Sequence, residues 1–208
     1  MAEIRNLVFD MGNVLLSYRW KEMLEVDRGL SPERAREVAR VTFKSDIWRD
    51  YDIGDIDEAG AIKRFHEEYP DVADDVEWFI NSSAEMPLPR YRTWELINEL
   101  KKLGYRTYIL SNYSGELYNM HTGPVEKAID FDGRVVSYEV HLLKPDIRIY
   151  EALLGKYDLK AEECLFFDDV EANIEGARSA GMHGIVVRKE EELNALLESY
   201  VNLGKVSL

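Results

Sequence analysis

The sequence predicts an α/β protein, a doubly wound parallel sheet into which a helical domain is inserted. Through most of the 208 residues, short apolar runs alternate with longer helical patterns, and this alternation is typical of right-handed βαβ units in a parallel sheet. Residues 17–87 break the alternation because they contain no convincing strand. We therefore expect a core formed by residues 1–16 and 88–208, with residues 17–87 as a helical cap domain.

Five short apolar runs are expected to form the strands of the core. Each has the length and composition of a buried strand. In chain order they are NLVF (6–9), RTYIL (106–110), GRVVS (133–137), CLFF (164–167) and GIVV (184–187).

Helical patterns with start and stop signals separate these strands and fill the insert. In the core, Gly104 and Gly181 are expected to follow the ends of two helices, and Asp146 is a candidate N-cap of another. In the insert, Ser31 precedes a proline at a first helical position, and Asp57 is a second candidate N-cap. Prolines near the end of the insert are expected to stop its last helix.

The composition limits the classes of partner. The formal charge of −14 makes nucleic acid and anionic membranes unfavourable partners, although local basic residues and a metal ion can still attract a small anion. The single cysteine, Cys164, allows no intrachain disulfide and fits a reducing compartment. No apolar run approaches the roughly 20 residues that cross a bilayer, and the N-terminus lacks the apolar region of a signal peptide. We expect a cytoplasmic protein, either a monomer or a dimer.

Reactive side chains follow the expected strands, at what would be one edge of the sheet. In open parallel sheets, ligands bind beyond the carboxyl ends of the strands. Asp10 follows the first strand, Ser111 and Asn112 the second, Lys144 the loop after the third, and Asp168 and Asp169 the fourth. Taken singly, each is explained as a turn, helix-cap or surface residue. Four separate turns that all supply reactive groups to one edge favour a functional site.

The charges of this group predict a metal ion and an anionic ligand. Two carboxylates about 4 Å apart repel by roughly 4 kcal/mol at an effective dielectric near 20, so three converging acids need cations. Lys144 supplies one charge, and a hard divalent ion, Mg²⁺, is expected to supply the rest. Metal and lysine would then face a phosphate, with the Ser111 hydroxyl and backbone N–H groups as donors.

Four motifs at these residues, in this order, resemble those of the haloacid dehalogenase (HAD) superfamily of hydrolases. They are VFDMGNV, ILSN, LLKPD and LFFDDVEANIEGA. The resemblance implies a HAD-like Rossmannoid core, and the insert resembles the C1-type cap of that family. The Asp-x-Gly-Asn-Val sequence resembles a subgroup that includes a glucose-1-phosphate phosphatase. It implies a phosphatase whose partner is a small phosphorylated metabolite, with a sugar phosphate as one candidate.

The resemblance also implies a role for each residue. Asp10 would be the nucleophile that forms an aspartyl-phosphate, and Lys144 would neutralise Asp10 and the phosphate. Ser111 and the backbone of Asn112 would hold phosphate oxygens. The Mg²⁺ ligands would be Asp168, Asp169, the Asp10 carboxylate and the Gly12 carbonyl, and Asn173 would either support them from behind or be only a helix-surface residue.

Gly12 is the departure from the family pattern. Phosphatases of the family usually carry a second aspartate there as general acid and base, and neither Gly12 nor Asn13 can transfer a proton. General acid–base assistance is typically worth about 10²–10⁴-fold, so the remaining groups would leave a slower phosphatase. We expect slow breakdown of the aspartyl-phosphate unless water, the substrate or a cap residue carries the proton.

The cap domain is expected to choose the substrate. In the segment DIWRDYDIGDID, Trp48 would stack on a sugar ring, and Arg49 or Asp52 would bond to its hydroxyls. An equally good interpretation makes Trp48 a core residue and Arg49 a surface charge.

Two alternatives to the phosphatase stay open. A haloacid dehalogenase needs Asp10 but no metal, and the acid pair 168–169 and the lack of the aromatic residue usual near its nucleophile argue against it. A non-catalytic phospholigand-binding protein is supported only by Gly12. No zinc site is predicted, because the four histidines, His66, His121, His141 and His183, show no ligand spacing.

Overall fold

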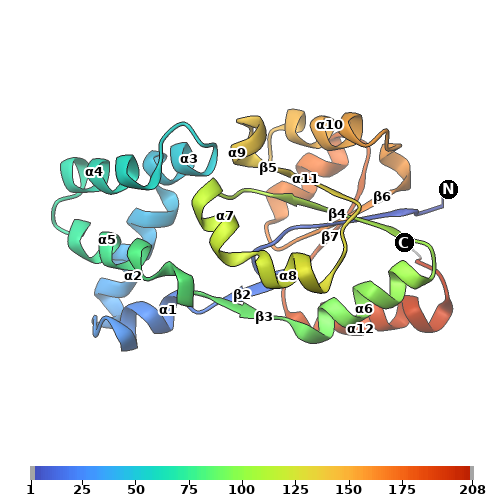
Figure 1. Cartoon of the computed structure of the whole chain (residues 1–208), viewed down its shortest axis with the longest axis horizontal. Coiled ribbons are helices and arrows are strands. Elements are labelled where there is room, and N and C mark those ends of the chain that lie inside the picture. Colours follow the sequence, from blue (N-terminus) through green and yellow to red (C-terminus); the bar gives the residue numbers. More distant parts are fainter. Residues whose placement is uncertain (1–2, 207–208) are drawn as a thin grey trace.

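The computed structural model describes residues 3–206 and contains a five-stranded parallel sheet with helices on both faces and a helical insert at one end (Figure 1). The strands are β1 (Asn6–Phe9), β4 (Arg106–Ser111), β5 (Gly133–Val136), β6 (Cys164–Asp168) and β7 (His183–Val186). Each lies within one residue of its predicted bounds at either end. The predicted fold class is therefore confirmed.

The strand order β5-β4-β1-β6-β7 places β1 in the middle of the sheet. Phe9, the last residue of β1, is in register with Ile109 of β4 and Phe167 of β6. The residues that follow these three strands are consequently brought to the same edge.

Helices cover both faces of the sheet (Figure 1). One face is covered by α6 (Tyr91–Lys102) and α12 (Glu190–Leu203), the other by α10 (Ile147–Lys156) and α11 (Glu171–Ser179), with the shorter α7 (Gly115–His121), α8 (Gly123–Ala128) and α9 (Ser137–Val140) beside them. Successive residues of a strand point to opposite faces. Leu7 and Phe9 therefore belong to one buried apolar cluster and Val8 to the other.

The helix signals of the core act as predicted. Gly104 and Gly181 have φ of +98° and +86° just after α6 and α11, a conformation that glycine adopts without strain. The Asp146 carboxylate accepts a hydrogen bond of 2.9 Å from the Arg148 backbone N–H, so it caps α10.

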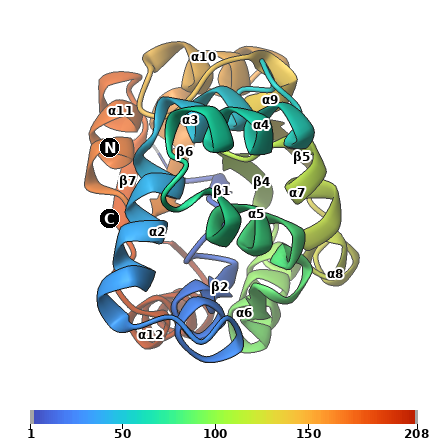
Figure 2. The same ribbon diagram turned by 90° about the vertical axis from the view of Figure 1, so that its left-hand side faces the viewer.

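The insert contains five α-helices and lies across the carboxyl end of the sheet (Figures 1 and 2). They are α1 (Trp20–Glu22), α2 (Pro32–Lys44), α3 (Asp46–Asp52), α4 (Glu58–Glu68) and α5 (Ala73–Asn81). The Ser31 and Asp57 side chains accept hydrogen bonds from the backbone N–H groups of Arg34 and Gly60. Both predicted N-caps are confirmed.

Two short strands connect the insert to the core, and the expectation that residues 17–87 contain no strand is wrong at both ends. β2 (Leu16–Tyr18) pairs antiparallel with β3 (Pro87–Pro89). Proline cannot donate to a ladder and normally argues against a strand. In a two-stranded ribbon the second edge of each strand needs no partner, so β3 tolerates its prolines.

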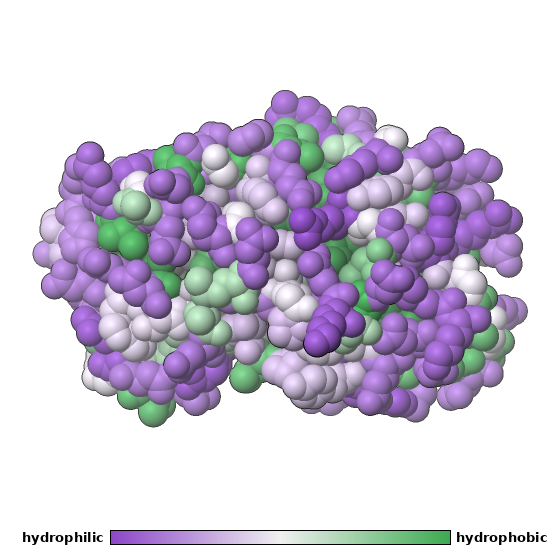
Figure 3. All heavy atoms as spheres, in the orientation of Figure 1, coloured by the Kyte–Doolittle hydropathy of each residue, from purple (hydrophilic) through white to green (hydrophobic). Residues whose placement is uncertain are grey.

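Hydrophilic residues cover most of the face shown in Figure 3, with scattered apolar residues between them. Within residues 3–206, no helix combines the length and apolarity that crossing a membrane requires.

Candidate active site

Three carboxylates meet at the carboxyl edge of the sheet. Asp10 directly follows β1, Asp168 is the last residue of β6, and Asp169 follows it. Each residue has one carboxylate oxygen that lies within 4.8 Å of the corresponding oxygens of the other two. The central strand and its neighbour thus bring together acids that are distant in the sequence.

Lys144 is the cation of this cluster. Its Nζ lies 2.9 Å from Asp10 Oδ1 and 2.6 Å from Asp168 Oδ2, and it donates to the Leu110 carbonyl at 3.0 Å. Its side chain is 1% exposed. Burial acts to lower the Lys144 pKa, but the two carboxylates outweigh it and the pKa is raised. The lysine therefore stays charged at neutral pH.

Burial and the neighbouring ammonium act in opposite directions on the ionisation of Asp10. Burial raises its pKa to about 6, with Lys144 acting in the opposite direction. Three ionised acids and one ammonium leave a formal charge of −2. A bound divalent cation would neutralise this charge, and carboxylate oxygens are ligands that Mg²⁺ prefers. The donor set therefore fits Mg²⁺.

Asp168 is held on both oxygens. The Val170 backbone N–H donates to Oδ1 at 2.8 Å, and the Asn173 amide donates to Oδ1 and Oδ2 at 3.0 and 3.1 Å. Asn173 is buried, so it is not a helix-surface residue. The structure places it behind the acids, where it orients Asp168.

Ser111 and Asn112 lie beside Asp10 at the end of β4. The Ser111 hydroxyl donates to Asp10 Oδ1 at 2.6 Å. The Asn112 side chain accepts from the backbone N–H of Lys144 at 2.8 Å and donates to its carbonyl at 3.0 Å. This pair of bonds fixes the loop that carries Lys144 against β4.

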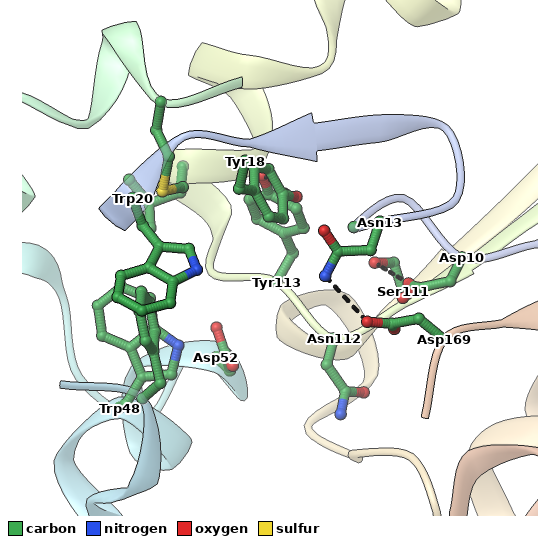
Figure 4. A pocket seen from close by; sticks show the side chains of 14 residues that line it. Asp10, Asn13, Tyr18, Trp20, Trp48, Asp52, Ser111, Asn112, Tyr113 and Asp169 are labelled. Atoms are coloured by element: carbon green, nitrogen blue, oxygen red, sulfur yellow. Dashed lines mark hydrogen bonds between the residues drawn. The ribbon is translucent and has the colours of Figure 1, made fainter. Parts of the chain in front are cut away.

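A cavity of about 280 Å³ opens in front of these groups (Figure 4). On the sheet side it is lined by Asp10, Gly12, Asn13, Ser111, Asn112 and Asp169. The rest of its wall is mostly aromatic and apolar: Tyr18, Trp20, Phe43, Trp48, Met86, Tyr113 and Leu117, with Asp52 as a further polar residue.

Of the three predicted cap residues, two line this cavity and one does not. Trp48 lines it and also packs edge-to-face on Phe43, at 5.2 Å between ring centroids. Asp52 lines it too, and burial together with the charge of Asp10 raises its pKa to about 7. Arg49 is not among its lining residues; its side chain is 58% exposed and pairs with Asp50 at 3.1 Å. Arg49 does line a second cavity that shares Trp48 and Asp52 with the first. The exposure of its side chain favours the surface-charge interpretation of Arg49, and its role stays a prediction.

Asn13 contributes to the site, although its side chain cannot transfer a proton. Its φ is +53°, a value that asparagine tolerates better than most residues. Its amide donates to Asp169 Oδ2 at 2.9 Å (Figure 4). The Gly-Asn pair directly after Asp10 was the available signal for a turn of this kind.

Tyr18, Tyr113 and His121 were not predicted at all. The Tyr18 hydroxyl donates to the Tyr113 hydroxyl at 2.8 Å, and the Tyr113 hydroxyl lies 2.8 Å from His121 Nδ1. The three residues come from β2, the loop after β4 and α7. No spacing in the sequence links them.

Comparison with known proteins gives a family match over most of the chain. A family model described as haloacid dehalogenase-like hydrolase matches residues 4–181. Drimenol cyclase drtB of Aspergillus calidoustus is 26% identical over 197 residues, which are 93% of this chain and 36% of that protein. This chain thus spans about a third of drtB. Sesquiterpene phosphatase astK of Aspergillus oryzae is 25% identical over 182 residues, 86% of this chain and 87% of that protein.

Solved structures share the fold. The HAD family enzyme bt-2542 of Bacteroides thetaiotaomicron, in a variant crystallised with magnesium and inorganic phosphate, has a TM-score of 0.67 at 23% identity and covers 88% of this chain and 93% of its own. L-2-haloacid dehalogenase of Xanthobacter autotrophicus has a TM-score of 0.65 at 16% identity, covering 94% and 83%. At these identities the likeness is evidence of the fold alone.

Proposed function

Because the chain belongs to the haloacid dehalogenase-like hydrolases and has a phosphatase among its relatives, we propose that it is a Mg²⁺-dependent phosphatase. It would cleave a small phosphate monoester through an aspartyl-phosphate on Asp10. The observation that carries the proposal is the surroundings of Asp10: Lys144 Nζ at 2.9 Å, and oxygens of Asp168 and Asp169 within 4.8 Å.

Asp10 is the proposed nucleophile. It stands at the end of the central strand, where the sheet holds its carboxylate in a fixed direction, and fixed placement of a reacting group removes much of the entropic barrier. Ser111 and Lys144 contact its Oδ1 at 2.6 and 2.9 Å. In the proposed reaction both would hold phosphate oxygens, together with the Asn112 backbone. Lys144 also offsets negative charge as the phosphoryl group approaches the acids.

The proposed Mg²⁺ ligands are Asp10, Asp169 and the carbonyl of Gly12. When bound, the ion would supply positive charge to the phosphate oxygens. Asp168 belongs to the same cluster, but both of its oxygens already accept hydrogen bonds from Lys144, Asn173 or Val170. We therefore propose that Asp168 does not bind the metal directly and instead positions Lys144 and Asp169.

The organic group of the substrate would occupy the aromatic side of the cavity. A volume of about 280 Å³ lies near the lower end for ligand sites, so the group is small or only partly enclosed. Apart from Asp52, the lining beyond the sheet edge is largely apolar. This favours an apolar or aromatic phosphate ester over the sugar phosphate predicted from the sequence resemblance, and the name of the sesquiterpene phosphatase relative points the same way.

Release of phosphate from 4-nitrophenyl phosphate tests the proposal. The protein is assayed with Mg²⁺, again with EDTA, and as the Asp10→Asn variant. We expect release that requires both Mg²⁺ and Asp10. Halide release from 2-chloropropionate in EDTA would instead identify a dehalogenase. Binding of inorganic phosphate without turnover at any Mg²⁺ concentration would identify a phospholigand-binding protein.

Competition between ester classes tests the substrate part. Farnesyl phosphate and 2-naphthyl phosphate are compared with glucose 1-phosphate at equal Mg²⁺. We expect a higher kcat/KM for the apolar esters. A higher value for the sugar ester would restore the prediction made from the sequence.

A further inference from the structure

Cleavage of a phosphate monoester needs a proton for the departing oxygen, and attack of water on the aspartyl-phosphate must release one. The polar side chains around Asp10 already form hydrogen bonds or ion pairs with one another. Ser111 donates to Asp10, Lys144 is shared between Asp10 and Asp168, and Asp169 accepts from Asn13. Gly12 has no side chain. The proton carrier has to come from elsewhere on the cavity wall.

Tyr18 occupies the space that a side chain at position 12 would enter. A Cβ atom built on Gly12 would lie 2.9 Å from Tyr18 Cε2 and 3.3 Å from its hydroxyl oxygen. The chain returns to this place because the backbone N–H groups of Leu15 and Leu16 both donate to the Met11 carbonyl, and β2 follows directly. Figure 4 shows Tyr18 and Tyr113 together on the cavity wall. A hydroxyl therefore stands where the sequence has no acid.

This hydroxyl begins a chain of hydrogen bonds that leads away from the cavity. Tyr18 donates to Tyr113 at 2.8 Å, Tyr113 lies 2.8 Å from His121 Nδ1, and His121 Nε2 lies 2.8 Å from the Ser83 carbonyl. A carbonyl only accepts, so Nε2 carries a hydrogen. In the neutral imidazole Nδ1 then accepts from Tyr113, and the Tyr18 oxygen is left to accept a proton at the cavity end.

We propose that Tyr18, Tyr113 and His121 form a proton relay that does the work of the side chain missing at Gly12. The proposal rests on the phosphatase function proposed above. The relay runs in both directions without moving a heavy atom, because each tyrosine hydroxyl can donate to either neighbour by rotation.

The relay would donate a proton in the first step of the reaction and accept one in the second. In the first, an Asp10 oxygen bonds to phosphorus as the bond to the organic oxygen breaks. That oxygen takes the Tyr18 proton, Tyr18 takes one from Tyr113, and Tyr113 takes one from Nδ1 of protonated His121. In the second, a water oxygen bonds to phosphorus as the bond to Asp10 breaks. The water proton returns along the same path to His121.

The surroundings of the relay agree with this direction of transfer. Tyr113 and His121 are 7% and 2% exposed, so the path is shielded from bulk water. Burial lowers the His121 pKa, partly offset by the bond to the Ser83 carbonyl. The lowered pKa makes protonated His121 a good proton donor in the first step, which leaves the imidazole neutral and ready to accept the water proton in the second step.

The test is stopped-flow turnover of 4-nitrophenyl phosphate with Mg²⁺ by the wild type and by Tyr18→Phe and Tyr113→Phe. Nitrophenolate departs without a proton, so the first step survives in both variants while the second loses its base. We expect a burst of nitrophenolate and a kcat about 10²–10⁴-fold below wild type, the range of general acid–base assistance. With ethyl phosphate, whose oxygen needs a proton, kcat/KM falls by a similar factor.

Tyr118→Phe is the matched control. Tyr118 is as deeply buried, its hydroxyl bonds to Glu126 at 2.8 Å, and its ring packs edge-to-face on Tyr113 without joining the relay. We expect wild-type kinetics. Tyr113→Phe leaves the Tyr18 ring beside Gly12, so a folding defect of one tyrosine variant does not remove the test.

The outcomes separate the relay from the phosphatase. If the wild type turns over and both relay variants match Tyr118→Phe, the relay is wrong and the phosphatase stands. If Asp52→Asn gives the burst instead, Asp52 carries the proton and the relay is again wrong. If the wild type releases no nitrophenolate with Mg²⁺, the proposed phosphatase function is wrong, and the relay proposal, which depends on it, is wrong too.

Discussion

Lys144 Nζ lies 2.9 Å from Asp10 Oδ1, although one residue follows the central strand β1 and the other the edge strand β5. The same ammonium lies 2.6 Å from Asp168. One buried cation thus joins the carboxyl ends of two strands to a loop from a third. The electrostatic balance of the site depends on it.

Replacement of Lys144 by methionine removes this cation while keeping most of the side-chain volume. Breaking a buried ion pair from one side typically costs about 3–5 kcal/mol, because it leaves an uncompensated charge. We expect a loss of unfolding free energy of that order by urea denaturation at pH 7.5 without metal, and no measurable phosphatase activity. Lys102→Met, at a lysine that is 70% exposed, should change stability by less than about 0.5 kcal/mol. Equal effects of the two substitutions would contradict the assigned role of Lys144.

Mg²⁺ should stabilise the folded protein. A ligand at a hundredfold excess over its Kd adds about 2.7 kcal/mol to the unfolding free energy. We expect the thermal midpoint to rise with Mg²⁺ and to fall back with EDTA, and Asp169→Asn to lose most of the rise. Glu171→Gln, at an acid that is 67% exposed on the next helix, should keep it. A full Mg²⁺ shift in Asp169→Asn would place the metal elsewhere.

The ionisation of Asp52 should make the stability difference between the wild type and Asp52→Asn depend on pH. Burial, with the charge of Asp10, raises its folded pKa from 3.8 to about 7, so the folded state binds the proton more tightly than the unfolded state. Between these pH values, stability falls as pH rises, by at most about 1.4 kcal/mol per unit. Asp52→Asn has no charge to bury. It should therefore be more stable than wild type at pH 8, with the difference disappearing towards pH 4.

Thermal melts of the two proteins at several pH values check this prediction. Asp130→Asn, at an exposed aspartate, serves as the control and should show no such pH-dependent difference. A difference between Asp52→Asn and wild type that is the same at pH 4 and pH 8 would show that ionisation of Asp52 is not its cause.

Trp48 and Arg49 are adjacent in the chain, but we expect substitutions of the two residues to affect substrate binding differently. Trp48 lines the cavity, whereas Arg49 faces solvent. An aromatic contact is worth about 0.5–1.5 kcal/mol, or about twofold to tenfold in affinity. We expect Trp48→Leu to raise KM for 2-naphthyl phosphate by that factor with little change in kcat, and Arg49→Ala to change neither. A larger effect at Arg49 would indicate that the cavity wall is assigned wrongly.

The sheet and the cluster of polar side chains at its carboxyl edge were predictable because both follow from the strand pattern. Short apolar runs gave the strands, and Asp10, Ser111 and Asp168 could be placed together because the carboxyl ends of parallel strands share one edge. Lys144 followed from the same rule, although a loop separates it from its strand. The prolines of β3 hid the connecting ribbon, since proline is a poor strand former.

The residues that complete the cavity could not be read from the sequence. Tyr18 meets Gly12 only because β2 folds back over the turn that follows Asp10, and His121 meets Tyr113 only through the placement of α7. Trp48 and Arg49 are neighbours in the short helix α3, and only the tertiary packing determines that Trp48 lines the cavity in front of Asp10 and Arg49 does not. These are tertiary relationships without a repeating sequence pattern.

Mass spectrometry of an acid-quenched reaction tests directly whether Asp10 becomes phosphorylated during turnover. The protein is mixed with 4-nitrophenyl phosphate and Mg²⁺, quenched on the millisecond scale and digested. We expect one phosphoryl group on the peptide that contains Asp10, absent in Asp10→Asn and absent with EDTA. Steady phosphate release with no phosphoryl group on that peptide, undiminished in Asp10→Asn, would contradict this expectation.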